Sequence, residues 1–247
     1  MHLTVVGCSG SFPGPDSPAS CYLLEFEGTR IVLDMGNGSL GHLQRYTDIY
    51  SVDAVILSHL HVDHFIDLCS YYVALKYRPD GPGPRVPVWG PADTRDRLLS
   101  AYGLDPRSDM DGELDVRALA PEFTVGPFTV TTTRMQHPVE SYAIRVAAGG
   151  RSLTYSGDTG PTPRLAELAQ GTDLALFEAS FVSDGDNPPD LHLTGAEAAG
   201  LAGRAGAARI LLTHLVPWND TERVRAEAAA VRSDVELAQP GLTIDLS

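Results

Sequence analysis

Short apolar and β-branched runs, separated by Gly, Pro and Ser, open the chain and predict strands. The expected strands are His2–Val6, Cys21–Glu27 and Arg30–Asp34. The second and third meet at Glu27-Gly28-Thr29, a sequence typical of a tight hairpin turn. The next run, Asp53–Ser58, is short and almost wholly apolar, which is typical of a strand buried on both faces.

Further along, helical and extended patterns alternate. We expect helices at Ser39–Tyr46, Asp63–Tyr77, Ala92–Tyr102, Pro163–Ala169, Gly195–Ala205 and Thr221–Val231. We expect strands at Val86–Trp89, Phe123–Met135, Ser141–Ala147, Ser152–Ser156, Asp173–Phe177 and Arg209–Leu212. This alternation predicts an α/β fold in which helices cover mixed sheets. The Pro- and Gly-rich stretch Pro79–Pro87 resembles a linker, but it is short and a strand follows it closely, so we expect one domain over residues 1–247.

Composition favours a globular protein of the cytoplasm. The hydrophobic fraction of 43% over 247 residues is enough for a buried core, and no apolar run approaches the length that spans a bilayer. The first residues, Met1–Gly7, lack the features of a signal peptide. The three cysteines, Cys8, Cys21 and Cys69, cannot all pair and form no CxxC motif. We therefore expect small buried hydrophobes in a reducing compartment.

The net charge of −14 disfavours a long nucleic acid as the substrate. Proteins that hold such a polymer usually carry a basic stripe. Here Lys76 is the only lysine among 18 basic residues. The arginines are scattered, with one loose cluster at Arg78, Arg85, Arg95 and Arg97. Bound divalent cations would offset part of the acidity, because some of the carboxylates would be ligands.

The strongest chemical signal is the stretch Ser58-His59-Leu60-His61-Val62-Asp63-His64. Four metal-competent side chains fall within six residues, between a buried strand and an expected helix. Imidazole and carboxylate together suit zinc or a neighbouring first-row metal. Chance clustering of histidines on a wet loop is a poor explanation of HxHxDH in this context.

Other candidate ligands follow later strands. His137, Asp158 and His214 each come just after an expected strand, and His192 also lies in a loop. One such histidine alone is more often a surface or core residue, but their shared placement favours a common site. The remaining two histidines, His2 and His42, receive no role.

At these residues the chain resembles the metallo-β-lactamase superfamily, and within it the tRNase Z group of phosphodiesterases. The matching landmarks are Val6–Ser11, Leu33-Asp34-Met35-Gly36, HxHxDH at 59–64, His137–Tyr142, Ser156-Gly157-Asp158-Thr159, Glu178-Ala179-Ser180, His192-Leu193-Thr194 and Leu212-Thr213-His214. HxHxDH alone identifies the superfamily, whereas the later stretches are more specific. The resemblance implies a four-layer αββα sandwich.

The resemblance also implies two divalent metal ions, zinc first, with manganese or iron as alternatives. His59, His61 and His137 would hold the first ion, Asp63, His64 and His214 would hold the second, and Asp158 would bridge them. Asp34 would orient a ligand histidine, although an ordinary turn residue explains it about as well.

Two departures separate this chain from the tRNase Z group. That group has a long arm that grips tRNA, whereas here only twenty residues separate His137 from Asp158 and two strands joined at Gly149-Gly150 fill them. Phe177 stands where the group typically has histidine. Both features resemble a smaller, arm-less actinobacterial branch of cyclic-nucleotide phosphodiesterases. Three further stretches share that resemblance: Pro15–Ser20, Pro188–His192 and Pro217-Trp218.

The expected reaction is phosphodiester hydrolysis by a hydroxide between two metals about 3.5–4 Å apart. Asp63 would orient the hydroxide. His192 lies just before Thr194–Glu197, a capping-box pattern, and is placed to protonate the leaving oxygen. Glu178 would hold the His192 imidazole. We expect a 3′,5′-cyclic nucleotide as the substrate, with Trp218 as a stacking surface for the base or, equally, as a core or interface residue.

Three alternatives stay open. A tRNA 3′-end endonuclease is weakened by the missing arm and the acidity. A thioesterase or lactonase would use the same metals, but those relatives generally lack the pair of Glu178 and His192. A non-enzymatic scaffold with a decayed site conflicts with the complete ligand set. We expect no membrane partner, and a homodimer would match related enzymes.

Overall fold

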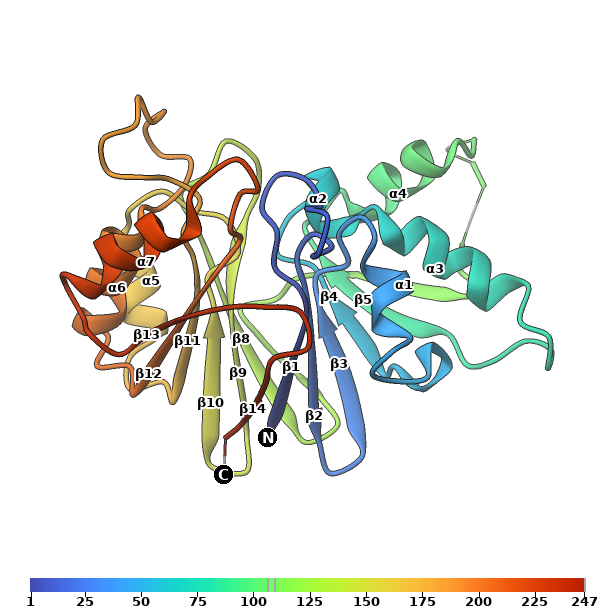
Figure 1. Cartoon of the computed structure of the whole chain (residues 1–247). Coiled ribbons are helices and arrows are strands. Elements are labelled where there is room, and N and C mark those ends of the chain that lie inside the picture. Colours follow the sequence, from blue (N-terminus) through green and yellow to red (C-terminus); the bar gives the residue numbers. More distant parts are fainter. Residues whose placement is uncertain (106, 109, 247) are drawn as a thin grey trace.

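Two seven-stranded sheets face each other in the computed structural model, which describes residues 1–105, 107–108 and 110–246 (Figure 1). The first sheet has the order β14 (Thr243–Asp245), β1 (His2–Gly7), β2 (Cys21–Phe26), β3 (Thr29–Leu33), β4 (Ala54–Ile56), β5 (Val86–Gly90) and β6 (Leu114–Ala118). The second has the order β13 (Val235–Leu237), β12 (Arg209–Thr213), β11 (Leu174–Glu178), β10 (Arg151–Tyr155), β9 (Tyr142–Ala148), β8 (Phe128–Arg134) and β7 (Glu122–Val125).

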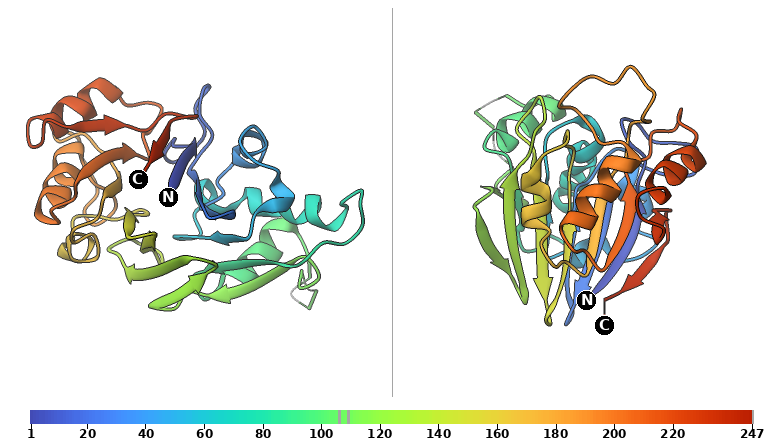
Figure 2. Two further views of the ribbon diagram at one scale, coloured as in Figure 1. Left: turned by 90° about the horizontal axis from the view of Figure 1, so that it is seen from below. Right: turned by 90° about the vertical axis from the view of Figure 1, so that its left-hand side faces the viewer.

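Helices cover the outer face of each sheet (Figures 1 and 2). On the first sheet lie α1 (Ser39–Leu43), the 3-10 turn η1 (Ile49–Ser51), α2 (Val62–Phe65), α3 (Asp67–Lys76) and α4 (Thr94–Tyr102). On the second lie α5 (Pro163–Leu168), α6 (Gly195–Arg204) and α7 (Thr221–Ala229). The layers are therefore α, β, β and α, which confirms the predicted sandwich.

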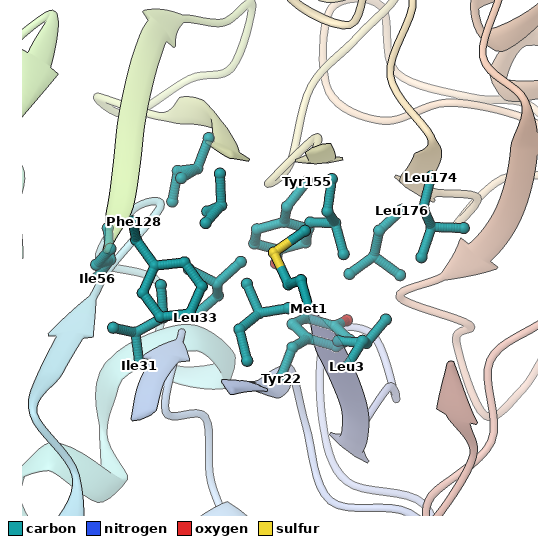
Figure 3. Packing of buried hydrophobic residues seen from close by; sticks show 14 of the residues in the cluster. Met1, Leu3, Tyr22, Ile31, Leu33, Ile56, Phe128, Tyr155, Leu174 and Leu176 are labelled. Atoms are coloured by element: carbon teal, nitrogen blue, oxygen red, sulfur yellow. The ribbon is translucent and has the colours of Figure 1, made fainter. Parts of the chain in front are cut away.

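Each strand supplies two apolar layers because successive side chains point to opposite faces. In β1, Leu3 and Val5 pack between the sheets, whereas Val6 packs under the helices of the first sheet. Figure 3 shows the layer between the sheets, where Tyr22 and Tyr155 meet with ring centroids 5.0 Å apart. A third cluster lies beneath α5, α6 and α7.

Two hairpins follow the expected turn chemistry. Glu27 and Gly28 have φ of 48° and 81°, and Gly149 and Gly150 have φ of 59° and 75°. Positive φ at both central residues matches the right-handed twist of the flanking strands. The second turn joins β9 directly to β10, with Ala148 paired to Arg151, so no arm is inserted there.

Parallel pairing brings several strand ends to one edge of the molecule. β3, β4, β5 and β6 are parallel, as are β10, β11, β12 and β13. The loops that leave their carboxyl ends gather at the edge beside α2 in Figure 1, while both termini lie at the opposite edge. This edge carries the residues with candidate chemistry.

Several predicted elements differ from those observed. The expected strand Phe123–Met135 is two strands, β7 and β8, because Gly126 turns the chain with φ of 53°. The expected helix Asp63–Tyr77 is two helices that meet at Ile66. Three strands were not predicted, namely β6, β13 and β14.

Three further predictions concern the stretch Pro79–Pro87, the cysteines and membrane-spanning helices. Residues 79–85 of the linker-like stretch Pro79–Pro87 connect α3, in the outer helix layer, to β5 in the first sheet. All three cysteines are free; Cys8 and Cys21 are buried and Cys69 is half-buried. Over the part of the chain that the structure describes, no helix is both long and apolar enough to cross a membrane.

Candidate metal centre

All seven predicted ligands meet at the edge where the parallel strands end. They come from the loop after β4 (His59, His61), from α2 (Asp63, His64) and from the loops after β8 (His137), β10 (Asp158) and β12 (His214). The placement follows from the topology, because the carboxyl ends of parallel strands share one edge of a sheet. Sequence reasoning therefore predicted this convergence correctly.

One group of ligand atoms consists of His59, His61, His137 and Asp158, all within 4.8 Å of one another. His61 Nδ1 lies 3.2 Å from His59 Nε2 and 3.2 Å from His137 Nε2. Asp158 Oδ2 is 3.5 Å from His59 Nε2. Three imidazoles and one carboxylate form a set that could hold one divalent ion.

A second group consists of Asp63, His64 and His214. The Nε2 atoms of His64 and His214 are 3.1 Å apart, and Asp63 Oδ2 lies 3.4 Å from the first and 3.1 Å from the second. Asp158 stands between the two groups, with Oδ1 3.4 Å from His64 Nε2 and Oδ2 3.4 Å from His214 Nε2. It is therefore placed where a bridging carboxylate would be.

A buried carboxylate, Asp34, fixes ligands of both groups from behind. It accepts hydrogen bonds from His64 Nδ1 at 2.7 Å, from the Ser58 amide at 2.6 Å and from the hydroxyls of Ser58 and Tyr155 at 2.7 Å each. Because the Ser58 hydroxyl donates to Asp34, Ser58 Oγ accepts from His59 Nδ1 at 3.1 Å. Asp34 thus turns the Nε2 atoms of His64 and His59 toward the centre, a role that metal sites commonly require.

A second buried carboxylate, Glu178 at the end of β11, fixes side chains of the site from the other sheet. Its Oε1 accepts from the Thr159 amide at 2.8 Å and from His192 Nδ1 at 3.0 Å. Its Oε2 accepts the Ser180 hydroxyl at 2.9 Å. Ser180 Oγ then accepts from His214 Nδ1 at 2.6 Å. Glu178 therefore holds His192 directly and orients His214 through Ser180.

The loop before His192 contacts the candidate ligand His137 directly. His137 Nδ1 donates to the Leu191 carbonyl at 2.9 Å, which leaves His137 Nε2 facing the other ligands. Asp190 has φ of 58°, and its Cα would lie 2.5 Å from a Cβ added at Gly160. The strained residue and the close glycine pack this loop against the one that carries Asp158.

The electrostatics of the carboxylates favour their charged forms. Burial by itself raises the pKa of Asp63, but His64 and His214 outweigh it and hold that pKa far below its usual range. Burial opposes ionisation of Asp158 too, and His214, His64 and His59 again hold its pKa well below the ordinary value. Both carboxylates are thus ready to bind a cation.

The pKa of each histidine depends on the charged groups around it. Burial lowers the pKa of His59, His61 and His137, so these imidazoles are neutral and can ligate. Burial also lowers the pKa of His64, but Asp158, Asp63 and Asp34 outweigh it and raise that pKa well above its ordinary value. For His192 burial acts in the same direction, yet Glu178 raises its pKa to about 9.

One atom gives a direct test of whether cations fit here. Asp158 Oδ1 is buried and accepts no hydrogen bond within the described part of the chain. A buried carboxylate oxygen without a donor is costly, and a divalent ion between the two groups would satisfy it. The nitrogen and oxygen donor set also suits zinc and neighbouring metals. The residues therefore fit a metal centre.

Sequence reasoning missed the supporting residues. Ser58, Tyr155, Ser180 and the Leu191 carbonyl received no role, although Ser180 lies in a stretch that carried the family resemblance. The position of Ser58 directly before His59 was a usable signal, whereas Tyr155 reaches Asp34 from the opposite sheet and gave none.

Trp218 is 69% exposed, which excludes it from the core.

The αββα sandwich and the convergent His and Asp groups at its edge define a metallo-hydrolase of the metallo-β-lactamase fold. A family model described as "Beta-lactamase superfamily domain" matches residues 29–215. The chain belongs to this family.

Three relatives show how far the similarity extends. The uncharacterized protein Rv1339 of Mycobacterium tuberculosis is 46% identical over 93% of this chain and 86% of that protein. The probable metallo-hydrolase YhfI of Bacillus subtilis is 30% identical over 98% of each, and its crystal structure matches with a TM-score of 0.88, 31% identity and 98% coverage of each chain. Ribonuclease Z of Methanosarcina acetivorans is 24% identical over 100% of this chain and 98% of that protein.

Proposed function

We propose that this protein is a phosphodiesterase that uses two divalent ions, zinc first, to hydrolyse small nucleotide phosphodiesters, and that 3′,5′-cyclic nucleotides are its substrates. The observation that carries the proposal is the pair of His192 and Glu178 beside the two ligand groups. His192 Nδ1 lies 3.0 Å from Glu178 Oε1 and 3.9 Å from Asp158 Oδ2. A proton donor is thus held at the rim of a site suited to metals.

Under this proposal His59, His61 and His137 would hold one ion, Asp63, His64 and His214 would hold the other, and Asp158 would be available to both. When bound, the ions supply a hydroxide near neutral pH and draw charge from the phosphate. Asp63 Oδ2 would accept a hydrogen bond from the attacking hydroxide and so orient it. His192, charged at neutral pH by its pKa of about 9, gives its proton to the leaving sugar oxygen.

The proton donor argues for a poor leaving group. A sugar alkoxide leaves as an alcohol only when it receives a proton, whereas a thiolate leaves without one. A thioesterase would therefore gain little from the charged His192. Glu178 keeps the His192 ring in one orientation, and the Thr159 amide fixes Glu178 in turn.

A tRNA 3′-end endonuclease is the second candidate, and the match to Ribonuclease Z over the whole chain favours it. Two features of this chain weigh against it. Between His137 and Asp158, the interval in which the tRNase Z group carries its arm, β9 turns straight into β10 at Gly149 and Gly150. The 18 basic residues are also outnumbered by 32 acidic ones, which opposes the many phosphate contacts that RNA binding draws on.

One assay separates these functions. Metal-loaded enzyme is incubated at equal concentration and physiological salt with cyclic AMP, cyclic GMP, 2′,3′-cyclic nucleotides, precursor tRNA, bis-p-nitrophenyl phosphate and a lactone. We expect turnover of the 3′,5′-cyclic nucleotides and of the nitrophenyl diester. Efficient cleavage of precursor tRNA with both cyclic nucleotides untouched would overturn the substrate assignment, and turnover of the lactone alone would overturn phosphodiester chemistry.

A further inference from the structure

Two exposed aromatic rings lie together beside the candidate metal centre. Trp218 is 69% exposed and Phe12 is 40% exposed, yet their ring centroids are only 5.1 Å apart with an interplanar angle of 38°. Trp218 therefore leans on Phe12 and keeps most of its surface open to solvent. Single exposed apolar residues are ordinary, but a paired and open indole calls for an explanation.

The loops that carry this pair are fastened to candidate ligands. The Ser11 amide, next to Phe12, donates to Asp63 Oδ2 at 2.8 Å. A Cβ added at Gly10 would lie 2.7 Å from His214 Nδ1, so this loop presses directly on the His214 ring. The pair is thus fixed one residue away from a contact with the second ligand group.

The two loops are also fastened to each other, and they lie side by side next to α2 in Figure 1. Leu215 N donates to the Cys8 carbonyl at 2.9 Å, and Gly10 N donates to the Leu215 carbonyl at 3.2 Å. Asn219 Nδ2 donates to the Ser180 carbonyl at 2.7 Å, which anchors the far side of Trp218. The two loops that carry Phe12 and Trp218 are therefore held in place relative to the metal centre.

Size argues for a small ligand rather than a protein partner. Even wholly free aromatic side chains offer only roughly 150–250 Å² each, and Phe12 and Trp218 are partly covered. A stable protein interface needs about 800 Å² from each partner. Two other exposed apolar residues also stand beside ligands. Val62 lies between His61 and Asp63, and Val139 follows His137 by two positions, exposed to 54% and 38%.

A cavity beside His192 is a weaker candidate for the same role. It encloses about 500 Å³, and its wall carries the carboxylates of Asp190 and Glu197 together with Phe181 and three prolines. The carboxylates suit sugar hydroxyls, but the flat face of a base needs an open apolar partner. Phe181 is half-buried and already packs against the His192 ring, with centroids 5.1 Å apart. The pair formed by Phe12 and Trp218 supplies such a partner on the side of the second ligand group.

We propose that Phe12 and Trp218 form a base-stacking subsite, on which the planar base of a nucleotide lies while its phosphate reaches the metal centre. This inference rests on the proposed function, because it assigns the base of the same substrate. A π-face is common to all bases, so the subsite binds adenine and guanine alike.

The test measures binding of a reaction product, so it needs no turnover. In metal-loaded protein with Trp89→Phe, Trp218 is the only tryptophan and reports stacking by fluorescence. We expect quenching by adenosine 5′-monophosphate and none by ribose 5-phosphate, which has the sugar and phosphate without the base. Calorimetry of Trp218→Ala should show binding of adenosine 5′-monophosphate weakened about 5- to 150-fold, with ribose 5-phosphate unchanged.

Two variants serve as controls. Trp218→Phe keeps a ring and should retain most of the affinity. Tyr77→Ala removes an equally exposed ring, 70% exposed at the end of α3, and should change nothing. Equal affinity of Trp218→Ala and wild type for adenosine 5′-monophosphate would overturn the subsite, and if Trp218→Ala also lowers the oligomeric mass, the pair is a contact between copies. Absence of cyclic AMP hydrolysis with quenching intact would instead remove the proposed reaction and leave the subsite standing.

Discussion

At the scale of single residues, the proton on His192 is held by a carboxylate that solvent does not reach. Glu178 is fully buried and binds His192 Nδ1, so replacing the imidazole should affect proton transfer and leave the ligands in place. His192→Ala should keep metal content near wild type and lower turnover of cyclic AMP by about 10²–10⁴-fold. Nitrophenyl diesters should lose less, because nitrophenolate leaves without a proton. Equal losses on both substrates, measured by steady-state kinetics, would remove His192 from this role.

Ser180 connects the same carboxylate to a candidate ligand. Ser180→Ala would leave Glu178 Oε2 without its donor and His214 Nδ1 without its acceptor. Groups behind metal ligands commonly contribute 10–100-fold to metal affinity, so we expect a loss of that size in a chelator competition assay. Ser180→Thr keeps the hydroxyl and should restore affinity. A merely structural role would predict loss of thermal stability with metal affinity unchanged.

The raised pKa of His64 predicts that metal binding depends on pH. Three carboxylates raise its pKa well above the ordinary value, so without metal it carries a proton at pH 7. Ligation requires neutral Nε2, and metal binding therefore releases that proton. His59, His61 and His137 have lowered pKa values and are already neutral, so they release none. Affinity should weaken as the pH falls and strengthen as it rises.

Calorimetry in two buffers of different ionisation enthalpy measures this directly. We expect at least one proton released as the second ligand group fills at pH 7, one from His64 and any further proton from the water that becomes hydroxide. No net release would show that His64 is neutral beforehand or is not a ligand.

At the scale of elements, strands and helices could be predicted where apolar residues recur with a regular strand or helix period. Elements without such a regular period were missed or merged. The hairpin at Gly28 and the capping box at Thr194 were read correctly because their chemistry is local. β7 and β8 were merged because apolar residues continue on both sides of the turn at Gly126. β6, β13 and β14 were missed because most of their residues are half-exposed or exposed, so no buried period marks them.

The turn after β3 has a steric requirement that can be tested. A Cβ at Gly36 would lie 2.0 Å from the Asp63 carbonyl oxygen, so the turn must shift away from α2. Gly36→Ala should lower the free energy of unfolding by about 1–3 kcal/mol and reduce metal loading, since Asp63 moves with its backbone.

Gly41→Ala is the matched control for Gly36→Ala. Nothing lies within 4 Å of a Cβ there, and Gly41 is exposed inside α1. That variant should be neutral or more stable by up to about 1 kcal/mol. Chemical denaturation of both variants checks the pair, and equal stabilities would show that the turn adapts to a side chain.

At the scale of the whole molecule, two things could not be read from one sequence. Pairings such as β14 with β1 join residues more than 200 positions apart, and no local pattern encodes them. The supports behind the ligands also cross between the sheets, as Tyr155 does in reaching Asp34. The clustering of the candidate ligands could be predicted because short motifs follow strands, and parallel strands bring their ends to one edge. The composition of the candidate site was therefore easier to predict than the layers that position it.

The absence of an arm is also a property of the whole molecule. β9 and β10 are joined by two glycines at the edge opposite the metal centre, and no extension is inserted between these strands. Specificity must then come from the loops around the centre, which include those of Phe12, Trp218 and His192. This geometry suits a small substrate that these loops can contact.

Restoration of activity by added metal tests the central claim most directly. Purified protein is stripped with a chelator and then titrated with zinc, while cyclic AMP hydrolysis and bound metal are measured on the same samples. The two ligand groups predict no turnover in the stripped protein and full turnover at two equivalents per chain. Undiminished turnover in the metal-free protein would contradict the account.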